Sequence, residues 1–464
     1  MRQEIRSPMT MSAKRFRLLE AIALLGLAFI SLIFLGRAAL ALEPQRVVSP
    51  GGIEAWLLQD DSNPLLSLSF AFRGGAAEQP EGLEGVAALS MALLTEGAGD
   101  YDSEAFQDEL ADRSIELSFA ASQDRLSGSL LTLTRHQEDA FRLLRLAMTE
   151  PRFDPEAVER LRQQFQVVQA RRLQDPSTIA WRNLYRLLFD DHPYARPSEG
   201  TPESLAAIQI EDLQNFVKEQ LARDRLYVAA AGDIDTRSLG RLLDETFGPL
   251  PEEGAPSRAP EVTPDPQGGL LVIEREQPQS NVAFAHAGIA RADPDFMAAT
   301  LVNHVMGGSS FSSRLFQEVR EKRGLAYSVY SGLSTLDKAP LIIGAVSSEN
   351  GRVAEALGLI QAEWQSMAEE GPSEEELRAA KDYLLGSFAL SLSSSPRISN
   401  TLLQLQLDGL GIDYMERRVE LIEAVTLEDA RRVAARLFDP DALTVVVVGK
   451  PVGLLSTRRP PGES

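Results

Sequence analysis

The sequence predicts an α+β protein made of two similar domains, each with a mixed or antiparallel sheet and helices packed on it. Its 464 residues exceed the roughly 250 to 300 at which a single hydrophobic core stops growing. The order of strands and helices after residue 270 repeats the order before residue 250, with a period of about 210 residues that is too long for a solenoid. Six prolines between residues 249 and 269 indicate a linker. We therefore expect domains at 42–250 and 270–455, joined by a linker at 251–269, and a tail at 456–464.

The first half contains short apolar segments, typical of strands, alternating with segments of helical periodicity. Dense apolar residues bounded by turn residues predict strands at 53–58, 65–72, 115–119, 125–133 and 226–231. Helices are predicted at 82–94, 103–113 and 136–148, with Ser103 as the cap of the second. A longer amphipathic helix follows Pro155, and we expect one buried face formed by Val158, Leu161, Phe165 and Val168.

The second half shows the same order of elements. Strands are predicted at 270–273, 282–287, 341–347 and 443–448, and helices at 295–306, 352–370 and 373–387. In both halves the final strand leads directly into a glycine, Gly232 in the first and Gly449 in the second. This agreement indicates an internal duplication.

The N-terminus has the pattern of a secretory signal peptide. Lys14, Arg15 and Arg17 precede an apolar run at 21–35, and the small residues Ala39 and Ala41 have the spacing of a cleavage site. We expect cleavage after Ala41 and export to a periplasm. The apolar run of about 15 residues is short for a membrane helix, which needs roughly 20, so an uncleaved membrane anchor is the less favoured alternative.

The composition excludes several classes of partner and site. The formal net charge is −21, which argues against nucleic acid and anionic membranes as partners. The chain has no cysteine, so disulfides and thiolate metal ligands are excluded. An exported protein without disulfides is compatible with a bacterial periplasm.

Three stretches connect the sequence to a known family. In SSRLFQEVREKRGLAYSVY, at 312–330, apolar residues at helical spacing lead into a basic end, a turn at Gly324 and a strand. The others are HPYARPSEGTPESL at 192–205 and VAAAGDID at 228–235. Together they resemble the pitrilysin/insulinase family of zinc metallopeptidases, which includes mitochondrial processing peptidases and bacterial two-subunit relatives. The resemblance implies two domains that face each other across a substrate chamber.

The resemblance also implies a zinc motif, His-x-x-Glu-His, on an early helix of the first half. In that motif two imidazoles bind zinc and the glutamate acts as a base for the zinc-bound water. Here the three positions are Ala88, Met91 and Ala92, none of which can serve as base or as a usable zinc ligand. The segment 163–175, where the third ligand is expected, contains no glutamate.

Histidines elsewhere offer no substitute site. The chain has four, and none has a metal-binding partner at helical spacing: His136, His192, His286 and His304. We expect them to be structural. The sequence therefore predicts that this chain binds no metal and no other cofactor.

Substrate-binding residues are nevertheless present in the second half. The resemblance implies an arginine and a tyrosine, seven positions apart, that reach the scissile peptide, and Arg320 and Tyr327 match them. Their guanidinium and phenol donors could orient a peptide and stabilise an oxyanion. The alternative is a surface ion pair for Arg320 and packing within a sheet for Tyr327. Gly307 and Gly308 could form a flexible substrate-facing loop, although a simple turn before a helix explains them equally well.

These features predict the non-catalytic, substrate-binding subunit of a heterodimeric zinc metalloendopeptidase that cleaves peptides or unfolded proteins. Activity would require a homologous partner subunit that carries zinc. One alternative is a purely structural subunit, like the core proteins of respiratory complexes, although an export signal argues against it. Another is a chaperone-like module that binds peptides without cleaving them, which would bind peptides on its own.

Overall fold

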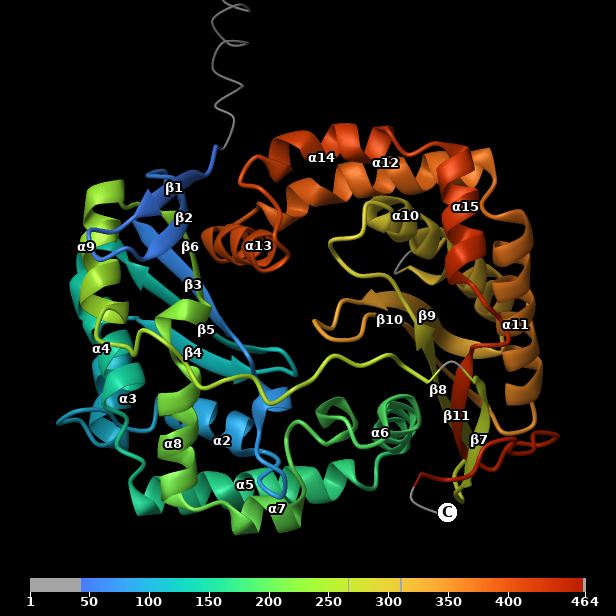
Figure 1. The fold of residues 1–464 in the computed structure, drawn as a ribbon, viewed down its shortest axis with the longest axis horizontal. Helices are drawn as coiled ribbons and strands as arrows, with labels where there is room; N and C mark the ends of the chain where they lie inside the picture. Colours follow the sequence, from blue (N-terminus) through green and yellow to red (C-terminus); the bar gives the residue numbers. More distant parts are fainter. Residues whose placement is uncertain (1–42, 266, 309–310, 462–464) are drawn as a thin grey trace, which may run out of the picture. The chain divides into compact units, whose positions relative to one another are not determined.

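The computed structural model describes residues 43–265, 267–308 and 311–461, and Gln45–Ser464 form one compact unit. The predicted signal peptide lies outside the described residues. Two sheets, each with its own helices and hydrophobic core, confirm the predicted α+β class (Figure 1).

The first sheet has six strands in the order β1-β2-β6-β3-β5-β4. Only the β2–β6 pair is parallel. The strands are β1 (Gln45–Val48), β2 (Glu54–Gln59), β3 (Leu65–Arg73), β4 (Glu116–Ala121), β5 (Arg125–Leu133) and β6 (Leu226–Gly232). The helices of this half are α2 (Val86–Leu93), α3 (Ser103–Asp112), α4 (Gln137–Thr149), α5 (Pro155–Arg172), α6 (Pro176–Phe189), α7 (Pro202–Ala207), α8 (Ile210–Gln220) and α9 (Thr236–Phe247).

The second sheet has five strands in the order β7-β11-β8-β10-β9, of which only β7 and β11 pair in parallel. The strands are β7 (Gly269–Glu274), β8 (Gln279–Ala287), β9 (Ala326–Ser334), β10 (Leu341–Glu349) and β11 (Thr444–Gly449). The helices are α10 (Phe296–Gly307), the π-helical turn η5 (Phe316–Glu321), α11 (Val353–Glu370), α12 (Glu374–Ser391), α13 (Ser395–Leu407), α14 (Tyr414–Glu423) and α15 (Leu427–Leu437).

The central strands of both sheets are buried on two faces, and successive side chains in each strand point to opposite sides. In β11, Val445 and Val447 pack into the core formed with the helices of the second half. Val446 and Val448 face the other way and pack against α6, which belongs to the first half. Each central strand therefore contributes to two separate hydrophobic clusters.

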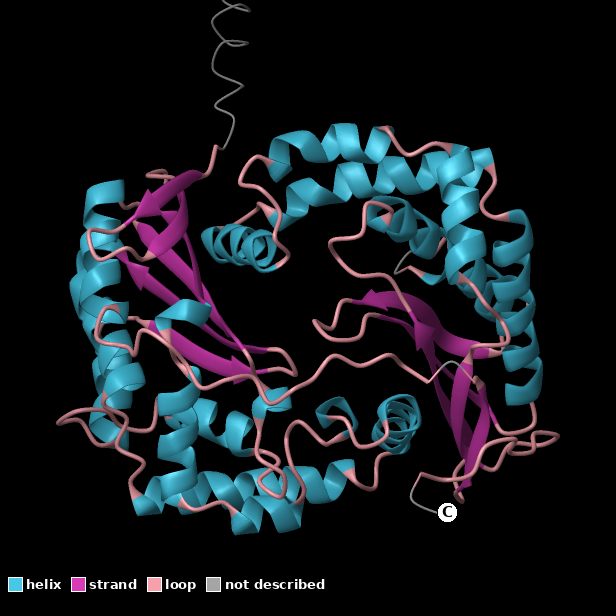
Figure 2. Ribbon diagram, viewed as in Figure 1, coloured by secondary structure: helices cyan, strands magenta, loops and turns pink. Residues whose placement is uncertain are grey.

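The two halves exchange one helix each (Figure 2). Helix α6 covers the free face of the second sheet, while α13 covers the free face of the first, next to Ala229 and Ala231. These alanines allow the helix to approach the sheet closely. Ser399 of α13 forms buried hydroxyl hydrogen bonds with Ser67 and Ser69, at 2.9 and 2.8 Å. The halves thus share their packing.

Several details differ from the sequence prediction. Helices α6 and α13 were not predicted. Each packs its apolar face on the sheet of the opposite half, and this long-range contact has no local signal in the sequence. Helix α3 is capped by Asp102, which accepts from the amide of Ala105, and not by Ser103. Val168 is exposed, so the buried face of α5 does not extend to it. The early helix begins at Val86 and not at 82, since the preceding chain turns through Gly82 and Gly85 with positive φ.

The segments predicted as linker and tail both contact a sheet or helix of the compact unit. Ser257 of the linker donates to the carboxylate of Glu78 at 2.6 Å, and Ala259 is buried against the second sheet. In the tail, the hydroxyls of Ser456 and Thr457 accept hydrogen bonds from backbone amides of β7. The tail therefore covers the outer edge of β7.

The exchange of helices predicts that the halves unfold together. Leu402 of α13 is fully buried against the first sheet, and Leu402→Ala should lower the free energy of unfolding by about 2 to 5 kcal/mol. Exposed Gln404 of the same helix is the control, and Gln404→Ala should change stability by less than about 0.5 kcal/mol. Urea unfolding followed by circular dichroism and tryptophan emission should give one coincident transition. Two separate transitions would contradict the shared packing.

Candidate functional site

Helix α2 carries the three positions at which zinc ligands and a base were sought. Met91 is 2% exposed and belongs to the core of the first half, while Ala88 and Ala92 are partly buried. Two methyl groups and a buried thioether do not form a zinc site. Among the described residues, no group of three or more histidines, cysteines, aspartates or glutamates is placed to bind a metal ion. The residues present therefore do not fit zinc.

Helix α5, where the third ligand was sought, supplies an amide in place of a carboxylate. Gln169 is buried and donates to the carboxylate of Glu199 at 3.2 Å. Arg172, one turn further along α5, forms an ion pair with the same carboxylate. The carboxylate of Glu199 thus interacts with an arginine and an amide of α5.

Arg320 and Tyr327 lie next to each other at the beginning of edge strand β9. The guanidinium carbon of Arg320 is 4.9 Å from the ring centroid of Tyr327 and 4.6 Å from that of Phe316. The side chain of Tyr327 is 85% exposed, so it does not pack within the sheet. Its hydroxyl has no hydrogen-bond partner among the described residues. Stacking on two rings therefore orients Arg320 and leaves both donor groups accessible.

Arg320 forms weaker ion pairs than the neighbouring cations Lys322 and Arg323. Glu318 accepts from Lys322 and, at 2.5 Å, from Arg323, and these hydrogen bonds lower the pKa of Glu318. Arg320 has a single ion pair with a described residue, Glu321, at the long distance of 3.7 Å. A surface ion pair is therefore present, but it does not occupy the guanidinium fully.

Gly307 and Gly308 lie where α10 packs closely on β9. A Cβ atom at Gly307 would be 2.4 Å from the hydroxyl of Ser331, and one at Gly308 would be 2.7 Å from the Cα atom of His304. Such distances exclude a side chain without movement of the backbone. Close packing accounts for both glycines without any contact to substrate.

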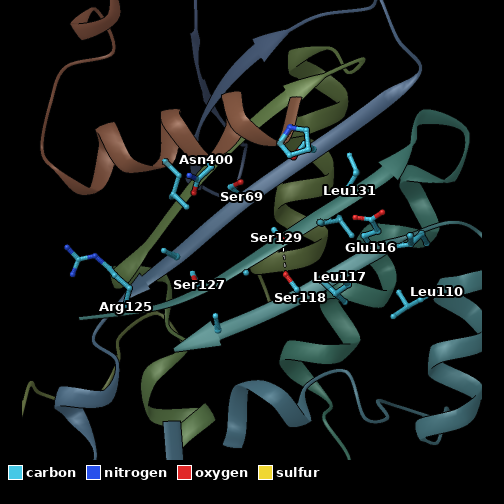
Figure 3. Close-up of a pocket in the computed structure, with 18 of the residues that line it drawn as sticks. Ser69, Leu110, Glu116, Leu117, Ser118, Arg125, Ser127, Ser129, Leu131 and Asn400 are labelled. Carbon is cyan, nitrogen blue, oxygen red and sulfur yellow. Dashed lines mark hydrogen bonds between the residues drawn. The ribbon is translucent and has the colours of Figure 1, made fainter. Parts of the chain in front are cut away.

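A groove of about 860 Å³ lies over the first sheet between β4, β5 and α13 (Figure 3). Most of its lining is small or polar, including the hydroxyls of Ser69, Ser118, Ser127 and Ser129 and the amide of Asn400. Strand β4 forms the edge of the sheet, so one side of its backbone has no neighbouring strand. The volume lies in the range of ligand-binding sites. This groove can accommodate an extended chain that pairs with β4.

Comparisons with known proteins agree with this arrangement. A family model described as the peptidase M16 inactive domain matches residues 207–384. The non-peptidase homolog YmxG of Helicobacter pylori is 24% identical over 417 residues, which cover 90% of this chain and 96% of that protein. The crystal structure of a peptidase M16 inactive domain from Pseudomonas fluorescens superposes with a TM-score of 0.83 at 26% identity, covering 90% of this chain and 100% of that one. Over most of its length the chain is therefore similar to proteins of the M16 peptidase family.

The predicted resemblance to pitrilysin/insulinase-type peptidases is thereby confirmed. An uncharacterized zinc protease of Mycobacterium tuberculosis is 32% identical over 273 residues, 58% of this chain and 62% of that protein. The description of the matching family model and the name of the Helicobacter pylori relative both support an M16 member without peptidase activity of its own.

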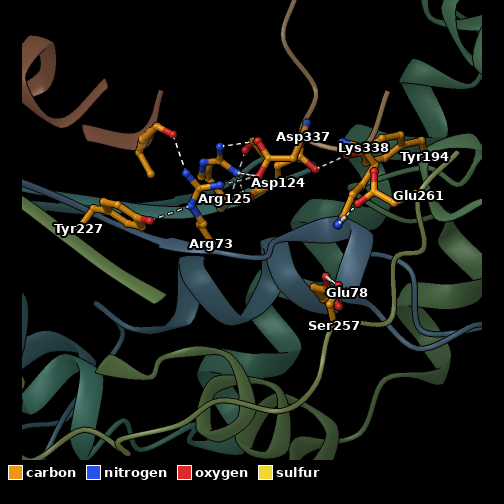
Figure 4. Close-up of polar contacts among 12 residues, drawn as sticks. Arg73, Glu78, Asp124, Arg125, Tyr194, Tyr227, Ser257, Glu261, Asp337 and Lys338 are labelled. Atoms are coloured by element: carbon orange, nitrogen blue, oxygen red, sulfur yellow. Dashed lines mark hydrogen bonds and ion pairs between the residues drawn. The ribbon is translucent and has the colours of Figure 1, made fainter. Parts of the chain in front are cut away.

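In this M16 homologue a polar clasp joins the groove region to the second sheet (Figure 4). Asp337, in the turn between β9 and β10, accepts two hydrogen bonds of 2.6 Å from Arg125 of β5. Burial acts to lower the pKa of Arg125, but the hydrogen bonds and charge of Asp337 outweigh it and raise the pKa. Asp124 accepts from the Tyr194 hydroxyl at 2.5 Å and from the amide of Asp337 at 3.0 Å. We refer to these four residues as the clasp.

The clasp and the groove were not predicted from the sequence. Arg125 and Asp337 are separated by 212 positions, so their pairing has no local signal. The serines of the groove did have a local signal in the sequence, because Ser127 and Ser129 alternate with buried residues along β5. That alternation indicates one polar face of the strand.

The clasp makes stability depend on pH through Asp124. Burial raises the pKa of Asp124, and the hydrogen bond from Tyr194 opposes this only in part. A carboxyl whose pKa is raised by folding binds more protons in the folded state. Its contribution to stability is therefore present at low pH and is lost as the pH rises through the folded-state pKa.

We expect Asp124→Asn to gain stability relative to the unsubstituted protein as the pH rises from about 4 to neutrality, because asparagine remains an acceptor without a charge. Urea unfolding at several pH values measures the difference. Asp235→Asn is a control of opposite sign. Asp235 caps α9, its pKa is lowered by hydrogen bonds from Ser238, and its contribution is lost as the pH falls. Parallel pH profiles for Asp124→Asn and the unsubstituted protein would refute this account of the clasp.

Proposed function

We propose that this chain is the non-catalytic, substrate-binding subunit of a heterodimeric zinc metalloendopeptidase. The observation that carries the proposal is the stacked pair of Arg320 and Tyr327 at the beginning of edge strand β9, in a chain whose α2 offers no zinc ligand. A guanidinium and a phenol that few protein groups engage are suited to a peptide carbonyl. The catalytic zinc would then come from a homologous subunit with an intact His-x-x-Glu-His motif.

The groove supports peptides or unfolded proteins as the substrate class. An extended peptide can bind to an exposed sheet edge as an additional strand, with main-chain hydrogen bonds supplying much of the affinity. The free side of β4 offers such an edge, and the surrounding hydroxyls are uncharged donors and acceptors. This lining suits a main chain better than one particular side chain.

Two relatives bear on the partner. The probable mitochondrial-processing peptidase subunit beta of Schizosaccharomyces pombe is 27% identical over 329 residues, 67% of this chain and 70% of that protein, and its name describes a subunit. Complex III2 of Candida albicans contains a chain of the same fold, with a TM-score of 0.71 at 16% identity. Assembly with a zinc-bearing homologue in the periplasm, after export by the N-terminal signal, is part of the proposal.

No helix in the described part of the chain is both long and apolar enough to cross a membrane.

The first test is of the metal. The mature chain from Leu42 onward should contain less than stoichiometric zinc by elemental analysis and should not cleave a quenched fluorescent peptide, because α2 lacks ligands and base. Cleavage should appear when a homologue with the intact motif is co-expressed. Stoichiometric zinc together with cleavage by the chain alone would disprove the assignment as a non-catalytic subunit.

The second test is of the stacked pair. In the active mixture, Arg320→Ala should lower kcat/KM by about 10²-fold, as expected for loss of a donor to the developing oxyanion, and Tyr327→Phe should also lower it. Lys322→Ala is the matched control, because Lys322 lies in the same basic stretch and is already paired with Glu318. Equal effects of the arginine and lysine variants would point to charge alone. Peptide binding without cleavage in every mixture would favour the chaperone-like alternative, and neither binding nor cleavage the structural one.

A further inference from the structure

A second cavity, of about 400 Å³, is distinct from the groove. It is formed by the end of α5, the first turns of α6 and the segment 194–200. Three arginines and one carboxylate line it: Arg172, Arg182, Arg196 and Glu199. The formal net charge of the protein is −21, whereas this cavity is lined by more positive than negative side chains.

The arginines of this cavity differ in what they contact. Arg172 forms an ion pair with Glu199, and Arg196 lies 3.9 Å from the carboxylate of Glu84. Arg182 has neither a hydrogen bond nor an ion pair with any residue that the structure describes. Burial and the nearby charge of Arg186 lower the pKa of Arg182, and the negative charge of Glu203 opposes this only in part.

A half-buried guanidinium without a hydrogen bond or a close ion pair is costly, because it loses hydration and the charge of Glu203 compensates only in part. Arg186, one turn further along α6, also lacks a partner among the described residues, but it is exposed and therefore hydrated. The difference in burial sets Arg182 apart. Arg182 is therefore placed to form an ion pair with an anionic ligand.

The wall beside Arg182 is apolar and aromatic. Trp181 and Tyr185 both line the cavity, with ring centroids 6.4 Å apart in an edge-to-face arrangement, and Leu173 adds an aliphatic surface. Leu173 is exposed and Trp181 is only partly buried. An apolar wall next to one unsatisfied cation is the usual composition of a small-ligand site.

We propose that this cavity binds a carboxylate joined to an apolar or aromatic side chain, with Arg182 as the counterion and Trp181, Tyr185 and Leu173 as the apolar wall. Two peptide features have this chemistry, a C-terminal carboxylate and an acidic residue beside an apolar one. Cleavage of a peptide bond creates a new C-terminal carboxylate, so the cavity suits the end of a product as well as that of a substrate. The inference rests on the proposed function only in taking the ligand to be a peptide.

The test uses small ligands and the mature chain without any partner. N-acetyl-phenylalanine, its C-terminal amide, and amidated N-acetyl-glutamyl-phenylalanine are titrated and followed by calorimetry and tryptophan emission. Trp56 and Trp364 are only 7% and 0% exposed, so the emission change reports mainly on Trp181. We expect the free acid to bind about tenfold more tightly than its amide, as for a hydrogen-bonded charge pair. Tight binding of the amidated dipeptide as well would identify side-chain carboxylates as a second source.

Two matched variants separate Arg182 from general charge. Arg182→Gln should abolish the preference for the acid and leave the affinity for the amide unchanged. Arg186→Gln removes the same charge from the exposed position of the same helix and should keep the preference. Circular dichroism checks that both variants fold, and Arg182→Lys, which keeps the charge, should retain part of the preference if Arg182→Gln does not fold. Equal binding of acid and amide, no binding of either, or a preference that survives Arg182→Gln would overturn the proposal.

These outcomes are independent of peptide cleavage. A preference for the acid without cleavage in any mixture would support this cavity and count against the proposed function. Cleavage in the mixture without such a preference would do the reverse.

Discussion

The fold depends on covering the apolar central strands of two sheets, on both faces, with helices from a single chain. Each half supplies enough helices for one face of its own sheet, and the other face is covered by a helix of the opposite half, α6 or α13. Separation of the halves would expose Val446 and Val448 on one sheet and Ala229 and Ala231 on the other. The hydrophobic effect therefore couples the halves more strongly than a flexible linker would. Edge strands β4 and β9 are parts of one packed unit as a consequence.

The polar clasp adds directional hydrogen bonds to this hydrophobic packing. A partly buried network of charges contributes little net stability, because desolvation and solvent offset much of the attraction between its members. Its hydrogen bonds are directional, however, and the two that Arg125 donates to Asp337 fix the turn at the end of β9 against β5. Since β9 begins with the residues that follow the stacked arginine, the same contacts restrict the strand that carries Tyr327. Hydrophobic packing holds the halves together, and the clasp fixes the position of the β9–β10 turn relative to β5.

The parts of the fold that local pattern determines could be predicted from the sequence. Dense apolar strands, the duplication and the turn at Gly324, which has a φ of +58°, all follow from neighbouring residues. Proximity of Arg320 and Tyr327 follows from a helical turn, one glycine and a strand within eight residues. The exchange of α6 and α13 could not be predicted this way. Ser399 of α13 is a polar residue on a buried face. Besides the local carbonyl of Pro396, its hydroxyl has two serines more than three hundred positions away as hydrogen-bond partners. Sequence reasoning also missed Arg182, whose significance lies in an absence of partners.

The residues of α2 and the arginines differ in what they contribute to the packed fold. Carboxylates and imidazoles without a metal would be poorly compensated in a packed helix, whereas Met91 packs into the core and Ala88 and Ala92 add no polar groups. The packing of α2 in the core therefore needs no metal ligand. Arg182 and Arg320 differ from these residues, because a half-buried cation without a close ion pair and a partly exposed arginine stacked on two rings contribute little to folding. Features that a fold does not need for its own stability are expected where ligands bind. The physical argument for a binding role therefore comes from the cations that remain, and is independent of the missing zinc ligands.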